Sequence, residues 1–127
     1  MPDEAQILLV EDNPALLRVT SFALQRSGLL VDEARDGQFA LDKMRERQYG
    51  LVITDQQMPR LCGTDLLREA RRLPGYETTP MVLLTAKALE LSRDELAEQL
   101  SVHHVLRKPF SPVEVSTLAK ELLSVAV

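Results

Sequence analysis

The sequence has little of what stabilises, anchors or targets many small proteins. Its 127 residues include one cysteine and no tryptophan, and only 4% are aromatic. The single cysteine, Cys62, excludes an intrachain disulfide and a zinc site built from several cysteines. The longest apolar runs, Ile7 to Val10 and Met81 to Leu84, span four residues, and the start Met1-Pro2-Asp3-Glu4 lacks a basic, apolar targeting pattern. We expect a cytoplasmic protein with no membrane partner.

Positive charge is also in short supply. Fifteen lysines and arginines face nineteen aspartates and glutamates, which gives a net charge of -4. This balance speaks against a protein whose main partner is nucleic acid or an anionic membrane surface. The length and the 45% hydrophobic content suit one globular domain that needs no disulfide or structural metal. We therefore expect a single domain over residues 1–127, with a core from about residue 6 to residue 124.

Short apolar runs alternate with longer segments of helical period along the whole chain. The predicted strands are Ile7–Val10, Leu29–Val31, Leu51–Thr54, Met81–Thr85 and Val102–Leu106. Continuous apolar strands that are each followed by a helix are typical of a parallel sheet with helices on both faces. The pattern predicts an α/β fold: a doubly wound, flavodoxin-like (βα)5 sandwich around a five-stranded parallel sheet of order 2-1-3-4-5.

Local signals mark where the helices begin and which side they bury. Asn13-Pro14 predicts a helix start, and Ser92 to Glu95 and Ser111 to Glu114 both have the pattern of a capping box. Gly28 is expected to end the first helix, and the last helix is expected from about Pro112 to Ser124. The predicted apolar stripes are Leu16, Leu17, Phe22 and Leu24; Phe39, Ala40 and Met44; Leu66, Leu67 and Ala70; and Val115, Leu118 and Leu122.

Polar residues follow four of the five predicted strands. Glu11 and Asp12 follow the first, Asp55 the third and Lys108 the fifth, while Thr85 ends the fourth. In an open parallel sheet the ligand site lies beyond the carboxyl ends of the strands, so this strand order brings the three carboxylates together. Crowded carboxylates need a cation, and an oxygen-only ligand set without His or Cys points to Mg²⁺, which also binds phosphate oxygens.

These residue types suit phosphoryl transfer. Asp55 can act as the nucleophile. The three equatorial phosphoryl oxygens then need positive charge and hydrogen-bond donors, which Mg²⁺, the Lys108 ammonium, and the Thr85 hydroxyl with nearby backbone N–H groups can supply.

The ordered set of motifs resembles the receiver domain of two-component response regulators, in particular the chemotaxis regulators, from Ile7 to about Leu123. The matching residues are Val10-Glu11-Asp12-Asn13, Asp55-Gln56-Gln57-Met58-Pro59 with Gly63, Thr85-Ala86 and Lys108-Pro109-Phe110. The resemblance implies that Asp55 accepts a phosphoryl group from a histidine kinase or a phosphotransfer protein. It also implies that Asp12, Asp55 and the Gln57 backbone carbonyl bind Mg²⁺, that Glu11 holds a metal-bound water, and that a cis peptide precedes Pro109.

The resemblance further implies a signalling module rather than an enzyme with a separate substrate. Its reactions would be its own phosphorylation and dephosphorylation, and its output would pass to a downstream effector through the fourth helix, fifth strand and fifth helix. Gln57 and Lys87, two residues past Asp55 and Thr85, should flank the path of the attacking water, and we expect slow self-hydrolysis because neither is a good general base there.

One position departs from the family pattern. Active receivers carry an aromatic residue three positions before the lysine, and here that position is Val105. Because a β-branched side chain has few rotamers and little bulk, we expect the signal to pass mainly through Thr85 and the loop from Ala86 to Leu91. Any phosphorylation-dependent homodimer should then be weak. His103 and His104 are consecutive on a predicted strand, so they point to opposite faces and cannot chelate one ion together.

Three alternatives belong to other classes of protein. An aspartate-nucleophile phosphatase normally needs a second aspartate two residues after the nucleophile, where this chain has Gln57. A flavodoxin-like cofactor binder would need a Ser/Thr/Gly-rich loop where this chain has Glu11-Asp12-Asn13-Pro14, which would repel phosphate in the absence of a metal. A pseudo-receiver that serves only as a protein-interaction domain remains open to a phosphorylation assay.

Overall fold

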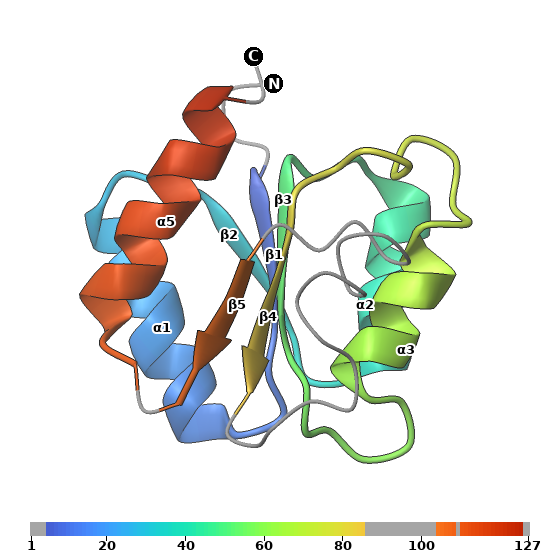
Figure 1. The fold of residues 1–127 in the computed structure, drawn as a ribbon, viewed down its shortest axis with the longest axis horizontal. Helices are drawn as coiled ribbons and strands as arrows, with labels where there is room; N and C mark the ends of the chain where they lie inside the picture. The colour runs from blue at the N-terminus through green and yellow to red at the C-terminus, as the bar shows by residue number, and fades with distance from the viewer. Residues whose placement is uncertain (1–4, 86–103, 109, 126–127) are drawn as a thin grey trace.

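A five-stranded parallel sheet forms the centre of the computed structural model, which describes residues 5–85, 104–108 and 110–125 (Figure 1). The strand order is β2-β1-β3-β4-β5, and the strands are β1 (Ile7–Val10), β2 (Val31–Ala34), β3 (Leu51–Asp55), β4 (Met81–Thr85) and β5 (His104–Arg107). The predicted fold class and strand order are confirmed. The predicted capping box at Ser92 to Glu95, the loop from Ala86 to Leu91 and the peptide before Pro109 lie outside the described residues.

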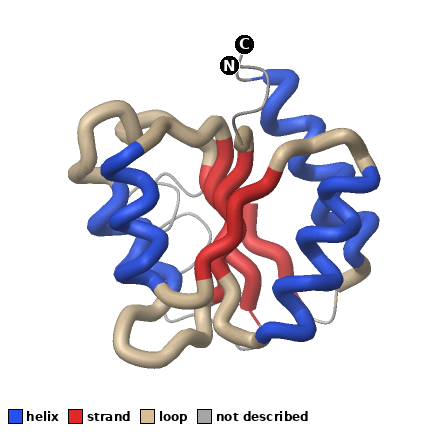
Figure 2. The backbone as a smooth tube through the Cα atoms, turned by 180° about the vertical axis from the view of Figure 1, so that it is seen from behind, coloured by secondary structure: helices blue, strands red, loops and turns tan. Residues whose placement is uncertain are grey.

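Helices cover both faces of the sheet (Figure 2). Helices α1 (Pro14–Arg26) and α5 (Pro112–Val125) pack together on one face, while α2 (Gly37–Glu46) and α3 (Gly63–Ala70) pack together on the other. No helix in the described ranges is long and apolar enough to cross a membrane.

The core has two halves that the sheet separates. Leu8 and Val52 pack toward α2 and α3, whereas Ile7, Leu9 and Ile53 pack toward α1 and α5. Alternate residues of one strand therefore serve opposite halves of the core. Because both faces of the central strands are covered, these strands have continuous apolar runs.

The capping signals form the contacts that their sequence predicts. The Asn13 side chain accepts hydrogen bonds from the backbone N–H groups of Ala15 and Leu16, at 3.0 and 3.1 Å. At the start of α5, Glu114 N donates to Ser111 Oγ at 3.2 Å and Ser111 N donates to Glu114 Oε1 at 3.4 Å, which completes a capping box. Gly28 follows α1 with a φ of +86°, as an αL residue that closes a helix.

Two predicted apolar stripes are wrong at their aromatic positions. Phe22 is 58% exposed and Phe39 is 52% exposed. On a helix with 3.6 residues per turn, Phe22 lies about 140° around the axis from Leu17, which is buried. Thr20 and Ser21 are buried beside Leu17 instead. Each exposed ring has a cation above it: Arg26 lies 5.8 Å from the Phe22 centroid, and Lys43 lies 5.2 Å from that of Phe39.

The bounds of three strands also differ from the prediction, and the smallest difference is that Leu51–Thr54 extends by one residue to Asp55. The strand predicted at Leu29–Val31 runs from Val31 to Ala34, and its residues Asp32 and Glu33 are polar. This strand lies at an edge of the sheet and pairs with β1, so its side chains are less buried than those of the central strands and apolarity does not mark it. In place of Val102–Leu106, the described part of the fifth strand runs from His104 to Arg107.

A network of hydrogen bonds ties three segments together at the amino-terminal edge of the sheet. The Tyr76 hydroxyl donates to the Arg47 carbonyl oxygen at 2.6 Å and accepts from the Tyr49 backbone N–H at 3.0 Å. The Tyr49 hydroxyl donates to Asp32 at 2.5 Å, and Arg47 pairs with the same carboxylate at 3.1 Å. Both tyrosines are buried, and the network joins β2, the start of β3 and the segment before β4.

Candidate functional site

The predicted site residues come together at the carboxyl edge of the sheet because of the strand register. Strands β1 and β3 are neighbours with Val10 opposite Thr54, so Glu11 and Asp55 are adjacent as the next residues along the two strands. The Lys108 backbone N–H donates to the Thr85 carbonyl oxygen at 2.7 Å, which anchors the lysine beside the end of β4.

Three carboxylates form a cluster at this edge. Oxygen atoms of Glu11, Asp12 and Asp55 all lie within 4.8 Å of one another. The side chains of Glu11 and Asp55 are 2% exposed. Asn13 N donates to the second Glu11 oxygen, Oε2, at 3.2 Å and holds that side chain in place.

The Lys108 ammonium provides the cluster with positive charge. Its Nζ lies 2.6 Å from Asp55 Oδ1 and 3.6 Å from Glu11 Oε1. Burial alone would lower the pKa of Lys108, but the contacts with Asp55 and Glu11 outweigh it and raise that pKa above its ordinary value. Lys108 is therefore a firmly charged group beside the Asp55 carboxylate.

One ammonium does not balance three carboxylates. Burial, with the charge of Asp55 as the next cause, raises the pKa of Glu11 to about 7. Burial also raises the pKa of Asp55, against the opposing effect of Lys108. Among the described residues, the buried oxygens Glu11 Oε1 and Asp55 Oδ1 both face the single Lys108 ammonium. Oxygen donors with excess negative charge are what a hard divalent cation prefers, so these residues fit Mg²⁺.

The Gln57 side chain has a contact that sequence reasoning missed. Its Nε2 donates to the Thr85 hydroxyl oxygen at 3.0 Å. The sequence points to Gln57 only through its backbone carbonyl. Gln57 lies 28 positions before Thr85, and no local signal predicts a pairing over that distance.

Close packing shapes the loop after β3. A Cβ added to Gly63 would lie 2.5 Å from the Asp55 carbonyl oxygen, so no larger residue fits without moving the chain. Cys62 is the N-cap of α3, but its side chain accepts no capping hydrogen bond from the backbone of the first turn. Gln56 takes over this role, since its Oε1 accepts from Thr64 N at 2.8 Å. Arg60 has a φ of +69°, in the left-handed region that favours glycine.

Comparisons with known proteins agree with this geometry. The family model described as "Response regulator receiver domain" matches residues 7–120. The chain belongs to the response regulator receiver family. It is 36% identical over 121 residues to the transcriptional regulatory protein ResD of Bacillus subtilis, which covers 95% of this chain and 49% of ResD. It is also 33% identical over 118 residues to SrrA of Staphylococcus aureus, which covers 93% and 47%. This receiver domain thus spans about half the length of the curated relatives it matches.

Solved structures of other receivers have the same fold. The chemotaxis response regulator CheY4 of Vibrio cholerae superposes with a TM-score of 0.82 at 27% identity, over 93% of this chain and 98% of CheY4. The receiver domain of the sensor histidine kinase PA1611 from Pseudomonas aeruginosa superposes with a TM-score of 0.81 at 30% identity, over 95% and 99%. That receiver has a magnesium ion coordinated in its active-site cleft.

Val105 and His104 lie on β5 of this receiver domain, away from the carboxylates. Val105 is half-buried and packs against the half of the core on the α2 and α3 side. His104 is exposed. His103, Lys87 and the loop from Ala86 to Leu91 lie outside the described residues, so the expected signal route through that loop stays a prediction.

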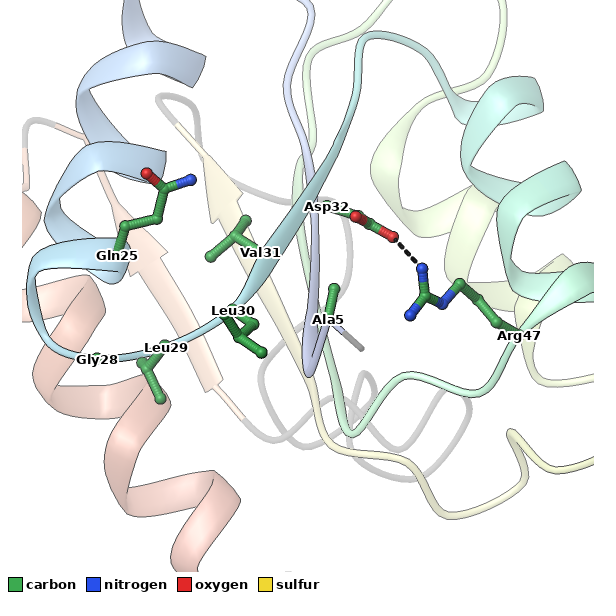
Figure 3. A pocket seen from close by; sticks show the side chains of 8 residues that line it. All are labelled: Ala5, Gln25, Gly28, Leu29, Leu30, Val31, Asp32 and Arg47. Carbon is green, nitrogen blue, oxygen red and sulfur yellow. Dashed lines mark hydrogen bonds and ion pairs between the residues drawn. The ribbon is translucent and has the colours of Figure 1, made fainter. Parts of the chain in front are cut away.

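A hollow of about 340 Å³ opens at the opposite edge of the receiver (Figure 3). Its lining includes Ala5, two residues before β1, and Leu30, the residue before β2. The hollow therefore lies at the amino ends of these strands. The charged groups that line it, Asp32 and Arg47, already pair with each other at 3.1 Å. The hollow is separate from the carboxylate cluster.

Proposed function

We propose that Asp55 accepts a phosphoryl group from a phosphohistidine of a histidine kinase or a phosphotransfer protein, with Mg²⁺ as cofactor. The observation that carries this proposal is the buried Asp55 carboxylate, which is 2.6 Å from the Lys108 ammonium and clustered with Glu11 and Asp12. A nucleophile, a fixed positive charge and a cation-binding set of oxygens then lie at one edge of the sheet. Membership of the receiver family supports the same conclusion.

The transfer uses groups that this chain supplies. One oxygen of Asp55 forms a bond to phosphorus while the bond between phosphorus and the donor's imidazole nitrogen breaks, and that nitrogen keeps the electron pair. Lys108 offsets negative charge on the phosphoryl oxygens, and the Thr85 hydroxyl donates a hydrogen bond to one of them. Attack by water later releases inorganic phosphate and restores the Asp55 carboxylate.

Glu11, Asp12, Asp55 and the Gln57 backbone carbonyl are the groups that would hold Mg²⁺. When bound, the ion neutralises the carboxylates and provides a ligand position for a phosphoryl oxygen. The cluster of three carboxylates beside a single ammonium supports this assignment.

The direct test is phosphorylation with a small-molecule donor. Intact-mass analysis after incubation with acetyl phosphate and Mg²⁺ should show one added phosphoryl group on the wild type and none on Asp55→Asn. Asp42→Asn is a matched control, because Asp42 is an exposed aspartate on α2 that pairs with Arg45; it should be modified like the wild type. Chelation of Mg²⁺ should abolish the adduct.

Two results would contradict the proposal. An unmodified wild type would favour a pseudo-receiver that acts only through protein contacts. An unchanged adduct on Asp55→Asn would show that another residue is the nucleophile. A phosphatase is disfavoured by Gln57, because an amide at that position cannot act as a general acid.

The phosphorylated domain would signal to an effector protein or domain through the face formed by the fourth helix, β5 and α5. ResD and SrrA are named transcriptional regulatory proteins, which supports an effector that acts on transcription. The acidic balance of this domain favours no direct contact with nucleic acid here. Because Val105 lacks an aromatic ring, we expect any homodimer through this face to be weak.

A further inference from the structure

The contact between Gln57 and Thr85 joins the ends of two strands across the proposed phosphoryl site. Gln57 lies two residues past Asp55, and Thr85 ends β4. Gln57 Nε2 donates to Thr85 Oγ1 at 3.0 Å, while the reverse arrangement, with Thr85 donating to Gln57 Oε1, has a longer distance of 3.4 Å. The shorter distance favours the arrangement with the amide as donor and the hydroxyl oxygen as acceptor.

With the Gln57 amide as donor, the hydrogen of the Thr85 hydroxyl is available for another acceptor. A threonine hydroxyl has one hydrogen to donate and two lone pairs that can accept. When the Gln57 amide donates to one lone pair of the hydroxyl oxygen, the hydroxyl keeps its hydrogen for an acceptor other than the amide nitrogen. The hydroxyl is then polarised by one hydrogen bond while it makes the next, which strengthens a bond that it donates to an anion.

The backbone around both residues restricts their movement. Gln56 N donates to the Leu84 carbonyl oxygen at 2.7 Å, and Lys108 N donates to the Thr85 carbonyl oxygen at 2.7 Å. The chain positions next to Gln57 and Thr85 are thus tied to each other and to Lys108. Thr85 is 1% exposed, so bulk water has little access to its side chain.

We propose that Gln57 is a positioning residue whose side-chain amide orients the Thr85 hydroxyl as a hydrogen-bond donor to the phosphoryl group on Asp55. The role belongs to the side chain and is separate from the metal-binding role of the Gln57 carbonyl. It rests on the proposed function, because it requires a phosphoryl group at Asp55. It predicts that loss of the amide weakens phosphoryl binding only while Thr85 keeps its hydroxyl.

The test uses beryllofluoride with Mg²⁺ as the probe, because this complex mimics a phosphoryl group on aspartate without turnover. Its affinity is measured by fluorine NMR titration on the full chain. Gln57→Met keeps the length of the side chain but has no N–H donor, and we expect it to weaken binding about three- to tenfold. Gln38→Met is the matched control on an exposed face of α2, where Gln38 bonds to Asp42; its affinity should equal that of the wild type.

A double-mutant cycle separates orientation of the hydroxyl from a general structural effect. Thr85→Val removes the hydroxyl and should weaken binding, and Gln57→Met should add no further loss in that background. Thr85→Ser keeps a hydroxyl, so in that background the loss caused by Gln57→Met should return. Thermal unfolding of each variant checks that it is folded, and Gln57→Ala replaces Gln57→Met if the latter is not.

The outcomes distinguish this inference from the proposed function. Equal or tighter beryllofluoride binding by Gln57→Met would overturn the inference, and tighter binding would make Gln57 a restraint on Thr85. Additive losses in the double variant, or no loss in Thr85→Val, would also overturn it while leaving phosphorylation of Asp55 intact. A wild type that takes up neither beryllofluoride nor acetyl phosphate would overturn the proposed function and this inference with it.

Discussion

Replacing Tyr76 with phenylalanine removes one oxygen atom that two backbone groups share, a buried N–H and a part-buried carbonyl. The Tyr76 hydroxyl donates to the Arg47 carbonyl oxygen at 2.6 Å and accepts from the Tyr49 N–H at 3.0 Å. Tyr76 is 1% exposed and Tyr49 is fully buried, so water does not replace the hydroxyl at the Tyr49 N–H. Each unsatisfied buried group costs about 1–3 kcal/mol, and the loss is partly offset because no hydroxyl remains to be buried. We expect Tyr76→Phe to lower the free energy of unfolding by about 2–4 kcal/mol.

Urea unfolding followed by circular dichroism measures this difference. Tyr49→Phe is the comparison, because it removes a hydroxyl whose partner Asp32 keeps its ion pair with Arg47. We expect Tyr49→Phe to lower the free energy of unfolding by only about 1 kcal/mol. Beryllofluoride affinity should be unchanged in both variants, since the network and the carboxylate cluster lie at opposite edges of the sheet. A loss below about 1 kcal/mol in Tyr76→Phe, or one equal to that of Tyr49→Phe, would refute the argument.

Two further predictions concern stability. Arg60 has a φ of +69° in the loop after β3, and Arg60→Gly should raise the unfolding free energy by about 0.5–1 kcal/mol in the same urea assay, because glycine adopts this conformation without steric cost; a destabilised variant would contradict it. Burial and the hydrogen bond to Asp32 raise the pKa of Tyr49 above its ordinary value of 10.0. The unfolded chain releases this proton first, so stability that is present below about pH 10 is lost as the pH rises further, by up to about 1.4 kcal/mol per pH unit. Urea unfolding between about pH 9 and pH 11 should show a shallower loss in Tyr49→Phe, and an equal slope would contradict the assignment.

The parts of the fold that the sequence predicted are those where one signal dominates. Central strands such as Met81–Thr85 are buried on both faces, so their apolar runs identify them directly. The edge strand Val31–Ala34 contains polar residues and is only partly buried. The prediction instead chose Leu29–Val31, because that run is more apolar. Phe22 was predicted to belong to the apolar stripe from the spacing of apolar residues, although it lies about 140° around the helix axis from the buried Leu17.

The same distinction holds at the site. Residues at strand ends, such as Asp55, were predicted because the topology alone decides that they meet. The hydrogen bonds of Gln57 to Thr85 and of Tyr76 to Tyr49 join residues 28 and 27 positions apart. They depend on side-chain rotamers and on the path of intervening loops, which neither spacing nor composition encodes. The capping hydrogen bond from Thr64 N to the Gln56 side chain was missed for the same reason. The one signal for it is that a cysteine at the N-cap position leaves the first N–H groups of α3 without a capping side chain.

Strand β3 lies between the tyrosine hydrogen-bond network and the carboxylate cluster, and its length separates them. It begins two residues after Tyr49 and ends at Asp55, and five residues of strand span about 17 Å. Substitutions this far apart with no shared partner act on stability and on function additively. We expect an amino-acid change that weakens the tyrosine network to lower the amount of folded protein and to leave the proposed phosphoryl site unchanged. The stability of this domain and its proposed phosphoryl chemistry can therefore change through separate sets of mutations.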